Sequence, residues 1–285
     1  MKPQVKTATL LFAGAFLLCP FFSLKKPPSA IVQAAVVRAE NPYGWDKISA
    51  YTTYYNQKDV GRCTNIAIAA SLIDGATIQP YGEFSFNATV GRRTAEAGFQ
   101  QAKIIVQGEY VQGVGGGVCQ VSTTLYNAAL KAGLTVTEFH PHTLLVGYVQ
   151  PSRDAMVSSG SDLRLFNPRA HAVRLSARVF EGGIRVSFYG KDEGERYEIV
   201  SKLLSEVPPP APIVKEGEKE EILREEKNGA KSEMYLERYR GEQLLSRQRL
   251  RVDEYRPVQG IIVKKISDTT NKIGSNDCLF KEKML

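Results

Sequence analysis

The chain has 285 residues, of which 43% are apolar, and a formal net charge of +7 at pH 7. This length allows one large domain or two smaller ones, and the apolar fraction is sufficient for a packed core. The mild positive charge suits an anionic partner such as a cell-wall polymer. No dense Lys/Arg block interleaved with aromatic residues is present, which argues against a nucleic-acid partner.

The N-terminal segment has the pattern of a secretory signal peptide. Lys2 and Lys6 precede an almost wholly apolar run over 7–22, and small residues suited to cleavage follow near Ala35 and Ala39. We expect 1–39 to be a signal peptide, or an uncleaved N-terminal anchor that would be the chain's contact with a membrane. Both alternatives place the remainder outside the cytoplasm, secreted or anchored in the cell envelope.

A folded body is expected over 51–190, after a linker at 40–50. Its first half mixes short strands with two helices. The expected elements are a strand at 51–55, a helix at 65–73 with Thr64 as its N-cap, a turn into a strand at 81–87, strands at 102–106 and 108–111, and a helix from Cys119 to a C-terminal cap at Gly133.

The second half of this body is rich in strands. We expect them at 134–139, 144–149, 163–166, 173–179 and 184–189. Helices first and strands second predict an α+β fold, in which the cysteine-bearing helix packs on a mainly antiparallel sheet.

The C-terminal third is expected to contain one small structured unit. Proline-rich and charged composition predicts a linker at 191–230, a β-hairpin unit at 231–265 turning at Gly241, and a disordered tail at 266–285.

The segment with the clearest chemistry is Gly115-Gly116-Gly117-Val118-Cys119-Gln120. Its glycines permit positive φ and close backbone approach. A thiol at a helix N-terminus feels the positive end of the helix dipole, which lowers its pKa and favours the nucleophilic thiolate. The sequence therefore predicts that Cys119 is a nucleophile.

The other cysteines leave an alternative open. Cys19 and Cys278 lie in the N-terminal and C-terminal segments, so Cys63 is the partner available to Cys119 within the body. A disulfide between Cys63 and Cys119 would be ordinary in an exported protein. The glycine-framed position of Cys119 favours a free thiol instead.

A cysteine nucleophile needs a base, and the base needs an orienting group. His140 and His142 follow the cysteine helix near a strand end, and Asp154 comes 12 residues after His142. Asp154 could equally be a turn carboxylate that accepts from backbone amides, and this is the role expected of Asp162. His171 is expected to be an exposed loop residue. A zinc site built from Cys119 and the His-x-His pair lacks a second ligand pair, so we expect no metal and no cofactor.

Other residues beside Cys119 are candidates for contact with a substrate. Backbone N–H groups of Cys119, Gly116 and Gly117 could bind an oxyanion. The side chains of Gln120, Ser122 and Tyr126 are candidate substrate contacts, although Ser122 or Thr123 could instead bond the first-turn amides of the helix.

Over 50–190 the sequence resembles the VanW family. The resemblance is carried by Asn65-Ile66, the blocks 82–87 and 90–94, Gly98-Phe99, Ala102, the long block 115–128, His142, Asp154-Ala155 and Asp162. The chain has Tyr81, Thr143 and Ser152 where the family usually has proline, serine and glycine.

The resemblance implies an exported bacterial envelope protein, in a family named for its association with vancomycin resistance, some of whose domains are thought to be L,D-transpeptidases that cross-link peptidoglycan stem peptides. It implies Cys119 as nucleophile, His142 as base and Asp154 as orienting group, with peptidoglycan as partner. The alternative is a non-catalytic wall-binding or accessory module in which Cys119 is structural.

Overall fold

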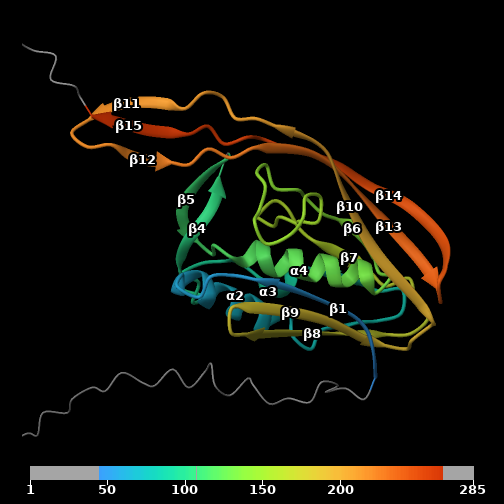
Figure 1. Ribbon diagram of the computed structural model, residues 1–285. Helices are drawn as coiled ribbons and strands as arrows, with labels where there is room; N and C mark the ends of the chain where they lie inside the picture. Colours follow the sequence, from blue (N-terminus) through green and yellow to red (C-terminus); the bar gives the residue numbers. More distant parts are fainter. Residues whose placement is uncertain (1–44, 107, 266–285) are drawn as a thin grey trace, which may run out of the picture. The chain divides into compact units, whose positions relative to one another are not determined.

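The computed structural model describes residues 45–106 and 108–265. Over these residues the fold is α+β with mainly antiparallel sheets, as predicted (Figure 1). The described helices are α2 (Val60–Ile73), α3 (Phe86–Val90) and α4 (Val118–Lys131). None of them is both long and apolar enough to cross a membrane. The expected signal or anchor segment at 1–39 and the expected tail at 266–285 lie outside the described residues.

A four-stranded antiparallel sheet supports the cysteine helix. Its strand order is β1-β9-β8-β2. The bounds are β1 (Asp46–Tyr54), β2 (Thr77–Ile78), β8 (Val173–Phe180) and β9 (Gly183–Gly190). Helix α4 packs on β1 and β9, while α2 packs on β8 and on α4 (Figure 1). The arrangement confirms the prediction of a cysteine-bearing helix on an antiparallel sheet.

Helix α4 is enclosed on nearly all sides. Every residue from Gln120 to Leu130 is buried, because β6 and β10 also pack on the helix. Its polar side chains are therefore bonded inside the protein: the Thr124 hydroxyl donates to the Gln120 carbonyl at 2.6 Å. A helix fixed this firmly holds the sulfur at its first turn in a defined place.

Two small sheets complete the first body. One has the order β3-β7-β6, and the other is the β4-β5 hairpin. The bounds are β3 (Glu83–Ser85), β4 (Gln101–Val106), β5 (Glu109–Val114), β6 (Thr135–Glu138) and β7 (Arg164–Phe166). The strand predicted at 144–149 is wrong: residues 141–150 form turns and loop, in which buried Leu144 fills the core without strand pairing.

The start of the body also differs from the prediction. β1 begins at Asp46, inside the range expected as linker. Helix α2 begins at Val60, where the Asp59 carboxylate accepts from the Arg62 amide at 3.0 Å. Thr64 is therefore not the N-cap, and Cys63 lies within the helix. Because glycine is typical of turns, Gly61 did not indicate the start of a helix. In the structure Gly61 allows close packing, since a Cβ there would lie 2.2 Å from the Gln101 carbonyl oxygen.

The segment 191–230 is largely β-structure and not a linker. It contains β10 (Glu195–Val207), β11 (Ile213–Gly217) and β12 (Glu221–Arg224), followed by β13 (Gly229–Arg240), β14 (Gln243–Tyr255) and β15 (Ile261–Lys265). β10 pairs with β13, which forms the predicted hairpin with β14. β11 and β12 flank β15. The prolines at 208–212 lie only between β10 and β11. The proline-rich and charged composition of the segment therefore predicted a linker where strands lie on either side.

Candidate functional site

The glycines before Cys119 are required by close backbone contacts. Gly117 is the N-cap of α4 with φ 107°, in the left-handed region that favours glycine. A Cβ on Gly116 would lie 2.7 Å from the Lys103 carbonyl oxygen, and one on Gly117 would lie 2.9 Å from Cγ of Arg62. The loop thus passes tightly between β4 and α2, and it delivers Cys119 to the first turn of α4.

The first turn of α4 leaves one amide uncommitted. The Val118 and Gln120 amides donate to the Gly115 and Gly117 carbonyls at 3.2 and 2.9 Å. Among the turn and cap hydrogen bonds of the described residues, none uses the Cys119 amide. This N–H is therefore the candidate oxyanion donor closest to the sulfur.

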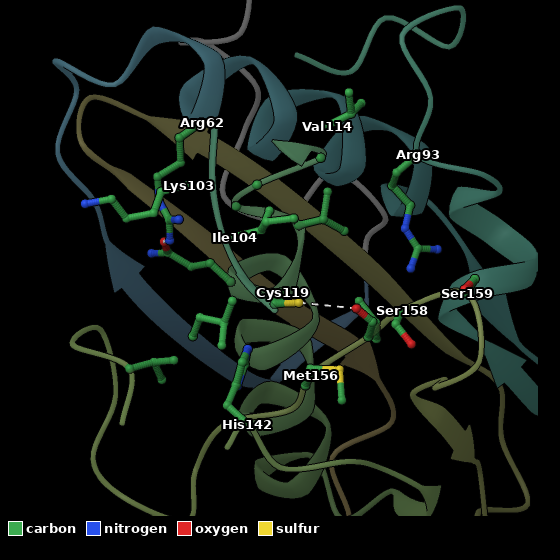
Figure 2. Close-up of a pocket in the computed structure, with 18 of the residues that line it drawn as sticks. Arg62, Arg93, Lys103, Ile104, Val114, Cys119, His142, Met156, Ser158 and Ser159 are labelled. Atoms are coloured by element: carbon green, nitrogen blue, oxygen red, sulfur yellow. Dashed lines mark hydrogen bonds between the residues drawn. The ribbon is translucent and has the colours of Figure 1, made fainter. Parts of the chain in front are cut away.

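Both cysteines of the body are free, so the disulfide alternative is wrong. Burial and the nearby Asp59 raise the pKa of Cys63, which makes it a poor nucleophile at neutral pH. Cys119 is partly exposed, and its Sγ lies 3.4 Å from the Val157 carbonyl oxygen (Figure 2). The two thiols therefore occupy different environments.

His142 and Asp154 come together beside this sulfur. The Asp154 carboxylate accepts from the His142 backbone N–H and from Nδ1 of its ring, both at 2.7 Å. Because Nδ1 is engaged with Asp154, Nε2 is the nitrogen left for Cys119, toward which the ring points in Figure 2. The structure thus brings together the three residues that the sequence singled out: Cys119 on α4, His142 on the 141–150 loop and Asp154 in the irregular segment 153–158.

The electrostatics of this alignment favour a thiolate–imidazolium pair. Burial acts to raise the pKa of Cys119, but hydrogen bonding and charge from His142, with Arg93 nearby, outweigh it and lower the pKa. Burial likewise acts to lower the pKa of His142, but the hydrogen bond to Asp154 and the interaction with Cys119 raise it to about 9. Asp154 is buried, yet its bonds to His142 keep its pKa lowered and the carboxylate charged.

Two residues of the C-terminal strands also hold Asp154, and sequence reasoning missed both. The Tyr255 hydroxyl donates to Oδ1 at 2.5 Å, and Nη1 of Arg251 donates to the Asp154 carbonyl at 2.8 Å. No local sequence signal identified them: Arg251, Asp253 and Tyr255 are buried and alternate with exposed neighbours on β14, so the strand register turns these polar residues inward.

Cys119 and His142 open onto a pocket of about 1010 Å³. Figure 2 shows Arg62 and Lys103 on one side of Cys119 and Arg93 on the other. The lining includes four cationic side chains, Arg62, Arg92, Arg93 and Lys103, and no aspartate or glutamate among the described residues. These cations come from α2, β4 and the 91–94 loop, so no local sequence motif predicted that they would share a pocket.

Tyr148 also lines the pocket and was missed. Burial, followed by the charge of Cys119, raises the pKa of its phenol, which therefore stays protonated. The Arg62 guanidinium lies 5.8 Å from its ring centroid. Tyr148 is thus a neutral hydrogen-bonding group close to the sulfur.

The predicted substrate contacts divide into two groups. Gly116, Gly117 and Gln120 line the pocket, but the Gln120 amide is committed to Arg62, Thr53 and Tyr54. Ser122 and Tyr126 are buried and lie outside the lining. Ser122 donates to the Ala155 carbonyl at 2.6 Å, and Tyr126 packs against Phe139. Neither can reach a ligand in the pocket, which corrects that expectation.

The remaining candidate residues have structural surroundings. Asp162 accepts from Ser85 and from the amides of Asn87 and Leu163, the turn role expected of it. His140 pairs with Glu138 at 3.0 Å, and His171 is exposed. Over the described part of the chain, no cluster of three or more His, Cys, Asp or Glu residues could hold a metal ion.

Comparison with known proteins adds a family and one relative. Residues 61–189 match the family described as "VanW like protein". The chain is 40% identical over 164 residues to a protein of Bacillus subtilis (strain 168) named "Uncharacterized protein YoaR". The match covers 57% of this chain and 54% of YoaR, so the chain spans about half the length of this relative. The family match contains Cys119, His142 and Asp154 and ends before β10.

Proposed function

We propose that residues 61–189, which match the VanW-like family, form a cysteine acyltransferase. It would act on peptidoglycan stem peptides outside the cytoplasm, in the manner of an L,D-transpeptidase. The observation that carries the proposal is the alignment of Cys119, His142 and Asp154, with 2.7 Å between Asp154 and Nδ1 of His142. A buried carboxylate behind an imidazole that faces a helix N-terminal thiol is the arrangement that cysteine acyl transfer requires.

In the first half-reaction the Cys119 thiolate attacks the carbonyl carbon of a peptide bond. The negative charge moves to the carbonyl oxygen, where the Cys119 N–H can stabilise it. The intermediate collapses as the C–N bond breaks, and Nε2 of His142 gives its proton to the departing amine. The product is a thioester on Cys119 and a neutral His142.

In the second half-reaction an acceptor amine attacks the thioester. Neutral His142 takes a proton from this amine, a new C–N bond forms, and the C–S bond breaks to restore the thiolate. Water in place of the amine would give hydrolysis. Asp154 keeps His142 in one orientation throughout, because its Oδ2 holds both the ring and the backbone of that residue.

A second candidate is a non-catalytic envelope module in which Cys119 is a packing residue. It is favoured by one observation: Cys119 packs against the hydrophobic core cluster that contains Val121 and Leu125. A thiol used only for packing gains nothing from a lowered pKa, whereas the surroundings of Cys119 lower it.

Mass spectrometry of the intact and digested protein distinguishes these candidates. The protein is incubated with a stem tetrapeptide and, separately, with a carbapenem, which acylates nucleophilic thiols. We expect an acyl mass shift on Cys119 that persists in Cys63→Ser and disappears in Cys119→Ser. Folded protein that shows no adduct with either reagent, or cross-linking retained by Cys119→Ser, would reject the enzyme and leave the module.

A further inference from the structure

The charge of the pocket identifies a chemical feature of its ligand. Four cationic side chains line a single pocket, and the described residues place no carboxylate in its lining, although the charges of Cys119 and Asp162 act on Arg93. A concave site lined by one sign of charge concentrates ligands of the opposite sign. The thiolate of Cys119 supplies one negative charge, so several positive charges remain for a ligand.

Arg93 is the best-prepared of these cations. Nη1 donates to Oδ1 of Asn87 at 2.8 Å and to the Gly91 carbonyl at 3.1 Å. These are its hydrogen bonds among the described residues, so the other two guanidinium nitrogens remain available. Neither is a buried atom without a partner, so both are accessible to solvent. A guanidinium fixed at one end and open at the other is suited to a planar carboxylate.

Two of the other lining cations, Arg62 and Lys103, are less suited to this role. Arg62 is held by Gln120, whose Oε1 accepts from Nη2 at 2.6 Å, and it lies over Tyr148. Lys103 lies over Tyr110, with 5.7 Å between its Nζ and the ring centroid. Arg62 thus supports the wall of the pocket, and Lys103 offers a point charge without directional pairing.

We propose that the pocket binds an acyl donor with a free carboxylate, which pairs with the open side of the Arg93 guanidinium opposite His142. The inference rests on the proposed function for the identity of the donor as a peptide. In a stem peptide the carboxylate could belong to the C-terminal leaving residue or to the side chain of the acyl residue, and both have the same chemistry.

Binding to Cys119→Ala tests the carboxylate without any chemical step. Three tetrapeptides are compared by calorimetry: one with both carboxylates free, one amidated at the C-terminus, and one amidated at the side chain of the third residue. We expect one amidation to weaken binding about tenfold, roughly the loss of one charge-assisted pair. The weakened peptide identifies the source of the carboxylate.

Arg93→Gln, made in the Cys119→Ala protein, should remove the preference between the free and amidated peptides. Arg185→Gln is the matched control, because Arg185 is on β9, outside the pocket lining, and its loss changes the net charge equally. Equal affinity for all three peptides, or equal weakening by Arg93→Gln and Arg185→Gln, would overturn the proposal. Acylation of Cys119 is measured separately, so a failed carboxylate preference is not mistaken for a failed enzyme.

A second inference comes from the contacts between Asp154 and the C-terminal strands. Asp154 is 1% exposed, and it would be costly to bury as a carboxylate with His142 as its single partner. Tyr255 donates to Oδ1, the oxygen that His142 does not use. Arg251 is itself fixed by Asp253 through bonds of 2.6 and 2.9 Å, and its Nη2 lies 3.6 Å from Oδ1.

The same strands hold the loops that carry the site. The Ser152 amide donates to the Tyr255 oxygen at 2.7 Å, and its hydroxyl lies 2.7 Å from that of Ser232 on β13. The Arg256 amide donates to the Thr143 carbonyl at 2.8 Å, next to His142. The contacts therefore reach the residues adjacent to His142 and Asp154 in the sequence.

We infer that Tyr255 and Arg251 are positioning residues, and that β13 and β14 complete the site although they lie outside the family match at 61–189. The groups whose charges act on Asp154 are His142 and Arg251, and Asp154 in turn acts on Tyr126, Tyr148 and Tyr255. Without the Tyr255 donor the Asp154 carboxylate holds its proton more strongly, and the imidazolium beside Cys119 loses support.

The pH profile of Cys119 alkylation by iodoacetamide tests this role. In Tyr255→Phe we expect the acid limb to move to higher pH and the rate at pH 7 to fall several-fold, with the thermal transition still cooperative. Tyr239→Phe is the control, because the Tyr239 hydroxyl donates to Glu237 on the same strand unit and away from Asp154. Arg251→Lys, which keeps the charge, should shift the limb less than Tyr255→Phe. An acid limb that coincides with wild type in folded Tyr255→Phe would overturn the inference.

Discussion

His142 contacts one oxygen of Asp154 twice: its backbone N–H and its Nδ1 both lie 2.7 Å from Oδ2. The two bonds fix the ring relative to its own main chain. Because Nδ1 must carry a proton to donate, Nε2 is directed at Cys119 whether the ring is neutral or charged. The carboxylate therefore determines both the tautomer and the direction of the base.

Replacement of His142 should affect chemistry far more than stability of the fold. We expect His142→Ala to lower the rate of acyl transfer by about 10²–10⁴-fold, the usual contribution of a positioned acid–base group. His140→Ala is the matched control, because that partly exposed ring pairs with Glu138 instead. Rates of thioester formation measure the effect. Equal losses in the two variants would contradict the role of His142.

The pKa values of the two free thiols should be shifted in opposite directions. The pKa of Cys119 is lowered from 9.0 and that of Cys63 is raised from it. At pH 7 we therefore expect alkylation of Cys119 to exceed that of Cys63 by about tenfold or more, since each pKa unit is a tenfold change in thiolate fraction. Peptide mapping after timed alkylation gives both rates in one sample.

Acyl transfer is expected to have an alkaline limit set by His142. A pKa raised to about 9 means that the pair is charged below this pH and loses its imidazolium as the pH rises through it. The stability gained from the raised pKa is complete below the ordinary value of 6.5 and is lost as the pH rises toward 9. Acyl transfer should decline as the pH rises through about 9, and a rate still rising above about pH 10 would exclude the ion pair.

Gly117→Ala should destabilise the protein. The residue has φ 107°, and its new Cβ would meet Cγ of Arg62 at 2.9 Å. We expect a loss of roughly 1–3 kcal/mol, as is typical of strained backbone positions. Gly160→Ala is the control, since nothing lies within 4 Å of the methyl group that this substitution adds and its φ is not positive. Chemical denaturation of both variants provides the comparison, and equal stabilities would be inconsistent with the strain.

Ser152 should respond differently to glycine and to alanine. Its φ of 63° favours glycine, while its hydroxyl pairs with Ser232 in a buried setting. Ser152→Ala keeps the backbone strain and leaves the Ser232 hydroxyl without this partner, at a cost of about 1–3 kcal/mol. Ser152→Gly relieves the strain and should lose less. Thermal unfolding of the two variants checks the order, and a more stable alanine variant would contradict it.

The local parts of the site were predictable because their chemistry lies within a few residues. A glycine run, a cysteine and an apolar helical face together predict a helix N-terminal thiol, which is where Cys119 lies. His142 and Asp154 could be named as candidates, but their 2.7 Å contact depends on a loop conformation that the pattern at 144–149 misrepresented as a strand.

The distant parts of the site were not predictable from local patterns. Arg62, Arg93 and Lys103 are ordinary surface residue types, and only the packing of α2, β4 and the 91–94 loop on the glycine loop brings them to one pocket. Tyr255 lies 101 residues from Asp154. The Tyr255 side chain points inward because of its position in the register of β14. This register depends on the pairing with β13 across residues 230–255.

Because Tyr255 follows Asp154 in the chain, the contact between them can form only after Tyr255 has been synthesised. A ribosome makes Cys119, His142 and Asp154 well before it reaches β14, and domains begin to fold as they emerge. The Tyr255 donor to the carboxylate is thus synthesised 101 residues after Asp154. A nascent chain that has not yet reached Tyr255 would hold Asp154 without this hydrogen bond.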